Sequence, residues 1–348
     1  MKIAIIHNQF IRSGGMESYL LTVLRGFLDA GDEVHLHVYK VDRQLVSQFT
    51  CRLHFSSLFF LPRRIRKYLF LHRYNQTFSA KDYDLSLSLT RTSCQDVAVV
   101  GGVHPQSVLT RKSRNIFRRL HDQVEIAFEG KMLRTVPWIV AHSKIIRDEI
   151  LSHYNIAADK IRILYPPIDE KRFVFPYGQE QEQPLFVFSE HKTTLLFPSM
   201  DHRRKGLEEL LLAYEQLDPE RYELVIVGNS GARMGHRNNI RYLGYIREMN
   251  VLYRAVDYVV LPSHYEPFGL VVAEALQCGT PVIVTRAVGA AELLTEDEGV
   301  ILPDNDPVTL VEAISRLEPK KVPPDFVGRH GLGTFRHIQA LKELVSAD

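Results

Sequence analysis

The sequence has 348 residues, of which 45% are hydrophobic and 24% are charged, and this composition excludes a disordered chain, a collagen and a small disulfide scaffold. At about 150 residues per domain, the length predicts two domains or three. The net charge of +2 conceals an asymmetry, because residues 1–168 hold 24 Lys and Arg against 14 Asp and Glu, whereas the remainder holds 19 against 27. The first half is therefore basic and the second half acidic.

The three cysteines, Cys51, Cys94 and Cys278, are scattered and form no CxxC pair. Neither a disulfide framework nor a zinc finger is indicated, and we expect a reducing, cytoplasmic environment. The four apolar residues after Lys2 are too few for a signal peptide, and no apolar run approaches the roughly 18 residues of a membrane span. Any membrane contact is therefore expected to be peripheral.

In the first half, short β-branched runs alternate with longer helical patterns. The expected elements are a strand at Ile3–Ile6, a turn at Gly14-Gly15, a helix at Met16–Asp29, strands at Glu33–Val38, Leu85–Leu89 and Val97–Val100, a basic helix from about Arg111 to Arg134, a strand at Trp138–Ala141, a helix at Ser143–His153 and a strand at Ile161–Leu164. This alternation is typical of a parallel, doubly wound sheet.

The pattern changes after this last strand, because Tyr165-Pro166-Pro167 and the stretch from Pro176 to Pro184 lack periodicity and indicate a hinge and a linker. A second series of strands and helices then runs from Leu195–Pro198 to Pro307–Leu317, and a last helix is expected at about Phe335–Val345. The sequence therefore predicts an α/β protein with two doubly wound domains.

The most informative stretch directly follows the expected strand Tyr258–Leu261. Gly269 allows a ligand to approach the backbone, and the free N–H groups at the start of the following helix favour an anion. Glu266 lies just before this helix and Glu274 about two turns inside it. Ligand hydroxyls would satisfy both carboxylates, and the equally weighted alternative is a helix cap and an exposed helix edge.

A run of cations, Arg203-Arg204-Lys205, follows the expected strand Leu195–Pro198 and precedes another helix. Arg and Lys at this place can neutralise the charge that develops on a departing nucleoside diphosphate. Cations at a helix start oppose the helix dipole, so a ligand role is favoured over a merely solvated face.

Glu266 and Glu274, with seven residues between them in EPFGLVVAEALQCGTPVI, resemble the signature of the retaining, nucleotide-sugar-dependent glycosyltransferases of family four. The resemblance extends to GGMESYL, VGGVHP, IVAHS, LYPPID and RRKGLEELLLAY, and is weakest over residues 40–80 and 320–348. It implies the GT-B fold, in which two Rossmann-like domains face each other across a cleft. We expect an acceptor-side domain at residues 1–167, a nucleotide-sugar domain at 168–330 and a C-terminal helix at 331–348 that crosses back to the first domain.

The resemblance also implies roles for residues of the second domain. Glu266 would contact hydroxyls of the donor sugar, Glu274 would hold the ribose, and the backbone of Phe268, Gly269 and Leu270 would lie against sugar and phosphate. Commoner members of the family carry their Arg five residues before the Lys, where Met200 stands here. Arg204 beside Lys205 resembles the variant of the lipopolysaccharide-core sugar transferases, and Arg203 remains an alternative for the diphosphate contact.

In the first domain, the resemblance implies that the loop at Gly15 approaches the donor phosphate and the acceptor. Glu17, in the same stretch, either takes part in this loop's contact with the ligand or is a charge in the first turn of the following helix, and the two readings are equally weighted. His104, in VGGVHP, would hydrogen-bond to the sugar or steer the acceptor; the alternative is a structural loop histidine. We therefore expect His104, Arg204, Lys205 and Glu266 at the reaction centre.

The first half also contains a possible metal-binding motif and two basic stretches. Asp82-Tyr83-Asp84 matches a D-x-D metal motif, but it is a usual strand entry without further ligands, so no metal and no cofactor besides the donor substrate is expected. Basic and aromatic residues interleave from Leu61 to Tyr74, and Arg111-Lys112-Ser113-Arg114 with Arg118-Arg119 adds a second cluster. No nucleic-acid motif accompanies them, and the alternatives are an anionic membrane surface, a phosphorylated acceptor or an ordinary surface helix.

The sequence thus predicts an enzyme that transfers a sugar from a nucleotide-diphosphate sugar to a hydroxyl of a glycolipid or oligosaccharide acceptor, with retention, in lipopolysaccharide or surface polysaccharide biosynthesis. We expect it in the cytoplasm, with peripheral association at the inner membrane open to it. The alternatives are a catalytically inactive nucleotide-sugar-binding or assembly protein, and a sugar epimerase of the same fold. The donor base, the sugar and the acceptor are not determined by the sequence.

Overall fold

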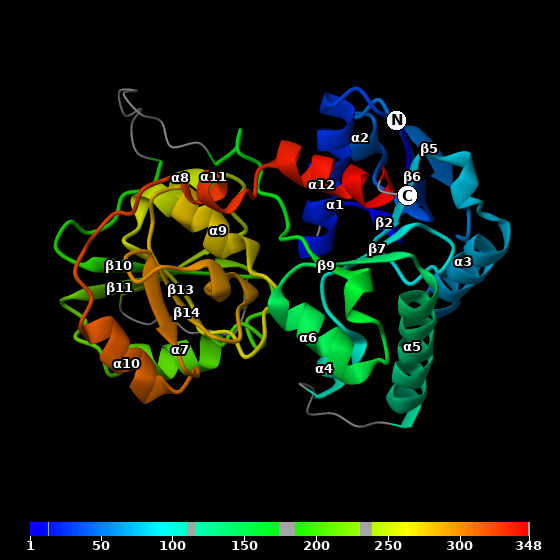
Figure 1. Cartoon of the computed structure of the whole chain (residues 1–348). Coiled ribbons are helices and arrows are strands. Elements are labelled where there is room, and N and C mark those ends of the chain that lie inside the picture. Colours follow the sequence, from blue (N-terminus) through cyan, green and yellow to red (C-terminus); the bar gives the residue numbers. More distant parts are fainter. Residues whose placement is uncertain (13, 110–115, 174–184, 230–238, 347–348) are drawn as a thin grey trace. The chain divides into compact units, whose positions relative to one another are not determined.

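The computed structural model describes the chain except for residues 13, 110–115, 174–184, 230–238 and 347–348, and except for the side chains of Arg63, Arg64 and Phe117. The chain divides into two compact units, Met1–Pro167 with Leu332–Asp348, and Ile168–Gly331 (Figure 1). The linker expected at 176–184 and the basic cluster expected at 111–114 lie outside the described residues. Among those described, no helix combines the length and apolar content needed to cross a bilayer.

The first unit is built on a parallel sheet with the strand order β5-β3-β1-β6-β7-β8-β9. Its strands are β1 (Lys2–Ile6), β3 (Glu33–Val38), β5 (Arg52–Phe55), β6 (Leu85–Ser88), β7 (Val97–Val100), β8 (Trp138–Ala141) and β9 (Ile161–Ile163), beside the small pair β2 (Gln9–Phe10) and β4 (Lys40–Val41). Its helices are α1 (Gly15–Asp29), α2 (Arg43–Val46), α3 (Arg63–Thr77), α4 (His104–Leu109), α5 (Ile116–Thr135), α6 (Lys144–His153) and α12 (Thr334–Ser346). The central strands are almost fully buried because helices cover both faces of such a sheet; β7 is apolar throughout, and β6 alternates leucine with the buried Ser86 and Ser88.

The second unit holds another parallel sheet, with the order β12-β11-β10-β13-β14-β15. Its strands are β10 (Thr193–Ser199), β11 (Tyr222–Gly228), β12 (Ile240–Gly244), β13 (Tyr258–Leu261), β14 (Val282–Thr285) and β15 (Gly299–Leu302). Its helices are α7 (Leu207–Tyr214), α8 (Met249–Ala255), α9 (Leu270–Gln277), α10 (Pro307–Ser315) and α11 (Phe326–His330). Two doubly wound, Rossmann-like sheets are therefore present, as the alternation of patterns predicted.

The C-terminal helix α12 belongs to the first unit and packs against α1 (Figure 1). The approach is close, because a β-carbon added to Gly26 of α1 would lie 2.6 Å from the Cγ2 of Thr334. His337 is buried, its Nε2 lies 2.8 Å from the Tyr19 hydroxyl, and its Nδ1 lies 3.1 Å from the Tyr165 carbonyl oxygen. Burial lowers the pKa of His337 to about 3, so this ring ties α12 to the domain as a neutral imidazole.

Candidate functional site

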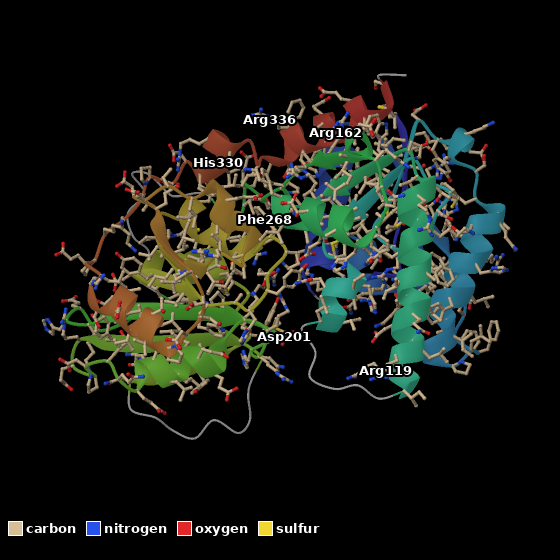
Figure 2. All side chains as sticks on the ribbon, turned by 60° about the horizontal axis from the view of Figure 1, so that its bottom comes forward. Arg119, Arg162, Asp201, Phe268, His330 and Arg336 are labelled. Carbon is tan, nitrogen blue, oxygen red and sulfur yellow. The ribbon has the colours of Figure 1, made fainter. Side chains whose placement is uncertain are left out.

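Two loops of the second domain meet at one edge of its sheet. β10 and β13 pair in parallel, with Leu195 opposite Tyr258, so the loops that follow them start from the same edge. The His264 amide donates to the Arg204 carbonyl at 3.0 Å and joins the loops directly. Asp201 and Phe268, which belong to these two loops, are labelled in Figure 2. The carboxyl edge of such a sheet is where doubly wound proteins bind ligands.

Two glycines shape these loops. Gly206 precedes α7 with φ 79°, and a β-carbon there would lie 2.0 Å from the carbonyl oxygen of Pro262 in the neighbouring loop. Gly269 precedes α9 with φ 92°. Only glycine adopts this left-handed conformation without strain, and only glycine fits against Pro262. The left-handed Gly269 also delays the helix to Leu270, so that Glu274 lies about one turn inside α9 and not the two turns expected.

The loops bring Arg204, Lys205 and Glu266 together. The Nη1 of Arg204 lies 3.0 Å from the Oε2 of Glu266 and donates to the Tyr265 carbonyl oxygen at 2.8 Å. The Nζ of Lys205 lies 3.7 Å from the same Oε2. Burial lowers the pKa of Lys205, while the charge of Glu266 opposes this shift. The Nε of Arg204 also lies 3.4 Å from the Oδ2 of Asp201, so two cations and two carboxylates meet at this edge.

Glu274 is held on α9 by Tyr253 of α8. The Tyr253 hydroxyl donates to Oε2 of Glu274 at 2.9 Å. Burial raises the pKa of Glu274, and the hydrogen bond from Tyr253 opposes this rise. The carboxylate is half-buried, so it is neither an exposed helix edge nor an enclosed core group.

The remaining predicted residues of this domain take different positions. Phe268 is buried, and its carbonyl oxygen accepts from the Ala290 amide at 2.7 Å. Leu270 begins α9 and is half-buried. The side chain of Arg203 is exposed and has no hydrogen bond or ion pair to another part of the chain that the structure describes. The loop thus brings Arg204, and not Arg203, to Glu266.

In the first domain, Gly15 begins α1 and is exposed. Glu17, in the first turn, accepts from the Gln9 side chain at 2.7 Å and lies 3.8 Å from the Nε2 of His7. The neighbouring His7 and the Gln9 hydrogen bond outweigh burial and lower the pKa of Glu17 to about 2. Glu17 is thus an anion with partners in its own domain.

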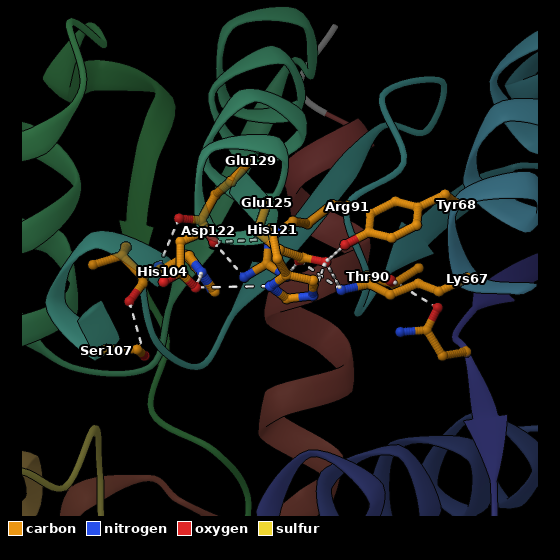
Figure 3. Close-up of polar contacts among 12 residues, drawn as sticks. Lys67, Tyr68, Thr90, Arg91, His104, Ser107, His121, Asp122, Glu125 and Glu129 are labelled. Carbon is orange, nitrogen blue, oxygen red and sulfur yellow. Dashed lines mark hydrogen bonds and ion pairs between the residues drawn. The ribbon is translucent and has the colours of Figure 1, made fainter. Parts of the chain in front are cut away.

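β7 ends at Val100, so His104 does not end that strand but begins α4. Its Nε2 lies 2.8 Å from the Oδ1 of Asp122 on α5, and its amide donates to Oε2 of Glu129 at 2.8 Å (Figure 3). The Tyr154 hydroxyl donates to the same Glu129 oxygen at 2.7 Å. Both the ring and the backbone of His104 are therefore fixed from α5.

The acidic side chains of α5 also bind a cation, Lys67, that the sequence placed on a basic surface. Lys67 of α3 bonds Glu125 through both carboxylate oxygens, at 2.7 and 2.6 Å, and Arg91 contacts Glu125 and Glu129 (Figure 3). Arg66 donates to backbone carbonyls of residues 59 and 61. Lys67 is thus paired with α5, and Arg66 is held by the backbone of the segment that precedes α3.

Two family models match the chain. The model described as Glycosyltransferase Family 4 covers residues 13–172, and the model described as Glycosyl transferases group 1 covers residues 191–318. A probable transglycosylase of Burkholderia thailandensis is 32% identical over 327 residues, which are 91% of this chain and 87% of that protein. The chain belongs to the group 1 glycosyltransferases. An O-antigen chain mannosyltransferase B of Escherichia coli is 29% identical over 73% of this chain and 70% of that protein.

Solved structures show the same fold for this glycosyltransferase. WaaG, a glycosyltransferase involved in lipopolysaccharide biosynthesis, gives a TM-score of 0.72 at 16% identity over 99% of this chain and 95% of its own. Anabaena HepE in complex with UDP-glucose gives 0.73 at 18% identity over the whole of both chains. The expected family and its GT-B fold are confirmed.

Sequence reasoning missed two serines at the sheet edge of this glycosyltransferase. Ser199 ends β10 and Ser263 follows β13, and within the described structure neither buried hydroxyl oxygen has a hydrogen-bond partner. Buried hydroxyls almost always have one. Their position could have identified them, since each lies at the carboxyl end of a predicted parallel strand.

Proposed function

We propose that this glycosyltransferase moves a sugar from a nucleoside diphosphate sugar to a hydroxyl of a glycolipid or glycan acceptor in lipopolysaccharide or surface polysaccharide biosynthesis, with retention of the anomeric configuration. The observation that carries this proposal is the cluster of Arg204, Lys205 and Glu266 at the carboxyl edge of the second sheet. The structural relative HepE in complex with UDP and with UDP-glucose supports a nucleotide-sugar donor.

The leaving diphosphate gains negative charge as the glycosidic bond breaks. Arg204 and Lys205 offer two cationic donors fixed on one short loop, and such preorganised charge stabilises a transition state without reorganisation. The unpartnered hydroxyls of Ser199 and Ser263 lie at the same edge, and phosphate oxygens would supply their missing hydrogen bonds. Together with helix N–H groups, these donors would hold the diphosphate without a metal ion.

The two glutamates suit the neutral parts of the donor. Glu266 accepts hydroxyl protons of the sugar while its charge keeps Arg204 and Lys205 in place. The bond from Tyr253 uses one oxygen of Glu274, and the other is left to accept the ribose hydroxyls. For the first domain we assign His104 a role towards the transferred sugar or the acceptor, with its ring orientation set by Asp122.

We also propose that the first domain associates with an anionic membrane, on the cytoplasmic face of the inner membrane. Exposed apolar side chains lie at the amino end of α3 and at the amino end of α5, two helices that the Lys67–Glu125 pair joins. They are Phe59 (78% exposed), Phe60, Ile65, Ile116 and Leu120. Arg118 and Arg119 are exposed on the same turns of α5, and Figure 2 labels Arg119. Apolar side chains beside cations are typical of interfacial binding to acidic lipids.

A panel of nucleotide sugars tests the proposal. One UDP-, GDP- or ADP-sugar is expected to raise the melting temperature, and the same donor is expected to release its nucleoside diphosphate when a lipid acceptor extract is added. The anomeric configuration of the product, measured by NMR, tests retention, and activity after chelation tests the absence of a metal. Binding without transfer would favour an inactive sensor, and an isomerised free sugar would favour an epimerase.

A further inference from the structure

Three histidines lie together at the edge of the first sheet, apart from every residue assigned to transfer above. His35 and His37 are two residues apart on β3, so their side chains share one face of the sheet. β5, the last strand in the order, pairs in parallel with β3 and places His54 opposite His37. Polar rings thus replace the apolar residues expected on the inner face of β3.

The ring nitrogens of the three histidines converge. His35 Nδ1 lies 2.9 Å from His54 Nε2, and one nitrogen of each ring lies within 4.8 Å of those of the other two. The Tyr83 hydroxyl adds an oxygen, 3.3 Å from His37 Nε2 and 3.5 Å from His35 Nδ1. Two nitrogens on one tetrahedral zinc ion are separated by roughly 3.3 Å, which follows from Zn–N bonds of about 2.0–2.1 Å. The 2.9 Å between His35 Nδ1 and His54 Nε2 is close to this value.

The outer nitrogens of the buried rings are also engaged. His35 Nε2 lies 3.0 Å from the Oε1 of Glu33, and His37 Nδ1 contacts the Tyr74 hydroxyl. A carboxylate on the outer nitrogen of a histidine is the usual support for a metal ligand, because it fixes the tautomer and orients the ring.

We propose that His35, His37 and His54 form a binding site for a divalent transition-metal ion of the zinc class. Imidazole nitrogens suit zinc, copper and nickel, and the donor set lacks the carboxylate oxygens that calcium and magnesium prefer. Because His54 is exposed on the edge strand, an ion reaches the site from solvent. The ion ties β5 to β3 at the sheet edge; it takes no part in transfer and is separate from the metal-free donor site proposed above.

One ring must move for this site to close. His37 stacks on His54, with ring centroids 4.2 Å apart and planes 11° apart, whereas His35 and His54 face each other through their nitrogens. The ion replaces the proton that His35 and His54 share, and His37 turns about its side-chain bonds to join them. The visible absorption spectrum of bound cobalt(II) therefore distinguishes coordination by three histidines from weaker coordination by two.

Cobalt(II) titration of the chelator-stripped full chain tests the site. We expect one equivalent to bind with the visible absorption bands of four-coordinate cobalt, zinc to displace it, and zinc to raise the melting temperature. His54→Gln, at the exposed edge, is expected to fold and to lose these bands together with the zinc-dependent stabilisation. His191→Gln, an exposed histidine of the second domain, is the matched control and is expected to keep both.

Three results would overturn the proposal. The first is a folded wild-type chain that shows no cobalt bands and no zinc-dependent rise in melting temperature. The second is binding that survives in both His37→Gln and His54→Gln, since the ion would then lie elsewhere. The third is a loss of stability in His37→Gln that is the same with and without zinc. This result would show that the three histidines stabilise the fold by packing and not by binding a metal. All three readouts are independent of transferase activity, so the failure of one proposal leaves the other intact.

Discussion

The guanidinium of Arg204 lies 3.0 Å from the carboxylate of Glu266, although the two residues follow different strands and are 62 positions apart in the sequence. The parallel pairing of β10 with β13 is what brings them together. Because Lys205 lies 3.7 Å from the same carboxylate oxygen, the cations are oriented before any ligand binds. Orientation in advance is what electrostatic stabilisation of a leaving group requires.

Arg204→Ala is expected to lower kcat by about 100-fold or more, the usual effect of removing one donor from a developing charge. Arg203→Ala is the matched control, because Arg203 is the neighbouring cation and its side chain is exposed. We expect it to retain most activity in steady-state assays with the identified donor. Equal losses in the two variants would assign the diphosphate contact to both arginines, and a loss in Arg203→Ala alone would reverse the assignment.

Glu274→Gln is expected to weaken donor binding by roughly 10- to 100-fold, the range for losing hydrogen bonds to a charged group. Isothermal titration with the nucleoside diphosphate measures it. Tyr253→Phe supplies a finer test, because the Tyr253 hydroxyl lowers the pKa of Glu274 against the effect of burial. Without that bond the carboxyl is protonated at higher pH, so the acid limb of donor binding should move upwards. Full transfer activity in Glu274→Ala would remove the ribose assignment.

Gly206→Ala is expected to destabilise the second domain by at least about 2 kcal/mol, since a left-handed alanine alone costs about 1–2 kcal/mol and the methyl group would meet the Pro262 carbonyl. The Arg204–Glu266 pair should be displaced with it. Gly328→Ala on α11 is the control, because nothing lies near its added methyl and alanine favours a helix. Chemical denaturation measures the stability of both variants. Similar midpoints would show that the loop can move to relieve the contact between residue 206 and the Pro262 carbonyl.

The fold could be predicted because β-branched runs and amphipathic helices record which side chains are buried. In α1, for example, Tyr19, Leu20, Val23, Leu24 and Phe27 recur at helical spacing and all are buried. β5 escaped prediction because it is a short edge strand whose side chains are exposed, so it has no burial pattern to read. The depth of Glu274 in α9 also escaped, because the left-handed Gly269 starts the helix at Leu270 without changing the hydrophobic pattern.

The candidate site was predictable where its residues share a loop and a motif, as Arg204 and Lys205 do. It was not predictable where partners come from other elements. The pairing of His104 with Asp122, and of Lys67 with Glu125, depends on how α5 packs against its neighbours. The sequence therefore indicated a basic surface at Lys67, where the structure shows an ion pair between the half-buried Lys67 and the buried Glu125.

Glu125→Gln tests the cost of that buried network. Burial raises the pKa of Glu125, but the hydrogen bond from Lys67 and the charge of Arg91 outweigh it and hold the pKa at about 2. A carboxyl with a lowered pKa contributes stability above its ordinary value of 4.5, here about 3 kcal/mol, and loses it as the pH falls from 4.5 to about 2.

At neutral pH, Glu125→Gln should therefore cost about 3 kcal/mol, because the half-buried Lys67 loses its carboxylate partner and Arg91 keeps only Glu129. The difference from wild type should shrink as the pH falls from 4.5 towards 2. Glu343→Gln, exposed on α12, is the control and should change little at any pH. A pH-independent difference in denaturant midpoints would mean that shape, and not charge, is what Glu125 contributes.

Association with anionic vesicles is the last prediction. The sequence predicts Arg63, Arg64, Arg66 and Lys67 as the cations that face lipid. Lys67 and Arg66 have partners inside the domain, and the side chains of Arg63 and Arg64 lie outside the described residues. We therefore expect the exposed Arg118 and Arg119 to face lipid. Neutralising both arginines should weaken binding by about 2 kcal/mol, or roughly 30-fold, at about 1 kcal/mol per cation. Sedimentation with vesicles of acidic phospholipid measures it.

Salt and apolar variants separate the two parts of this binding. Added salt should weaken the wild type because surface charges are screened, and should weaken Arg118→Gln/Arg119→Gln less. Phe59→Ser/Phe60→Ser should lose binding at every salt concentration, since exposed aromatic rings insert regardless of charge. Arg316→Gln/Lys320→Gln in the second domain matches the charge change and should bind like the wild type. Absence of vesicle binding at low salt would contradict membrane association. An equal fall in the control variant would show that the first domain is not the part that binds the membrane.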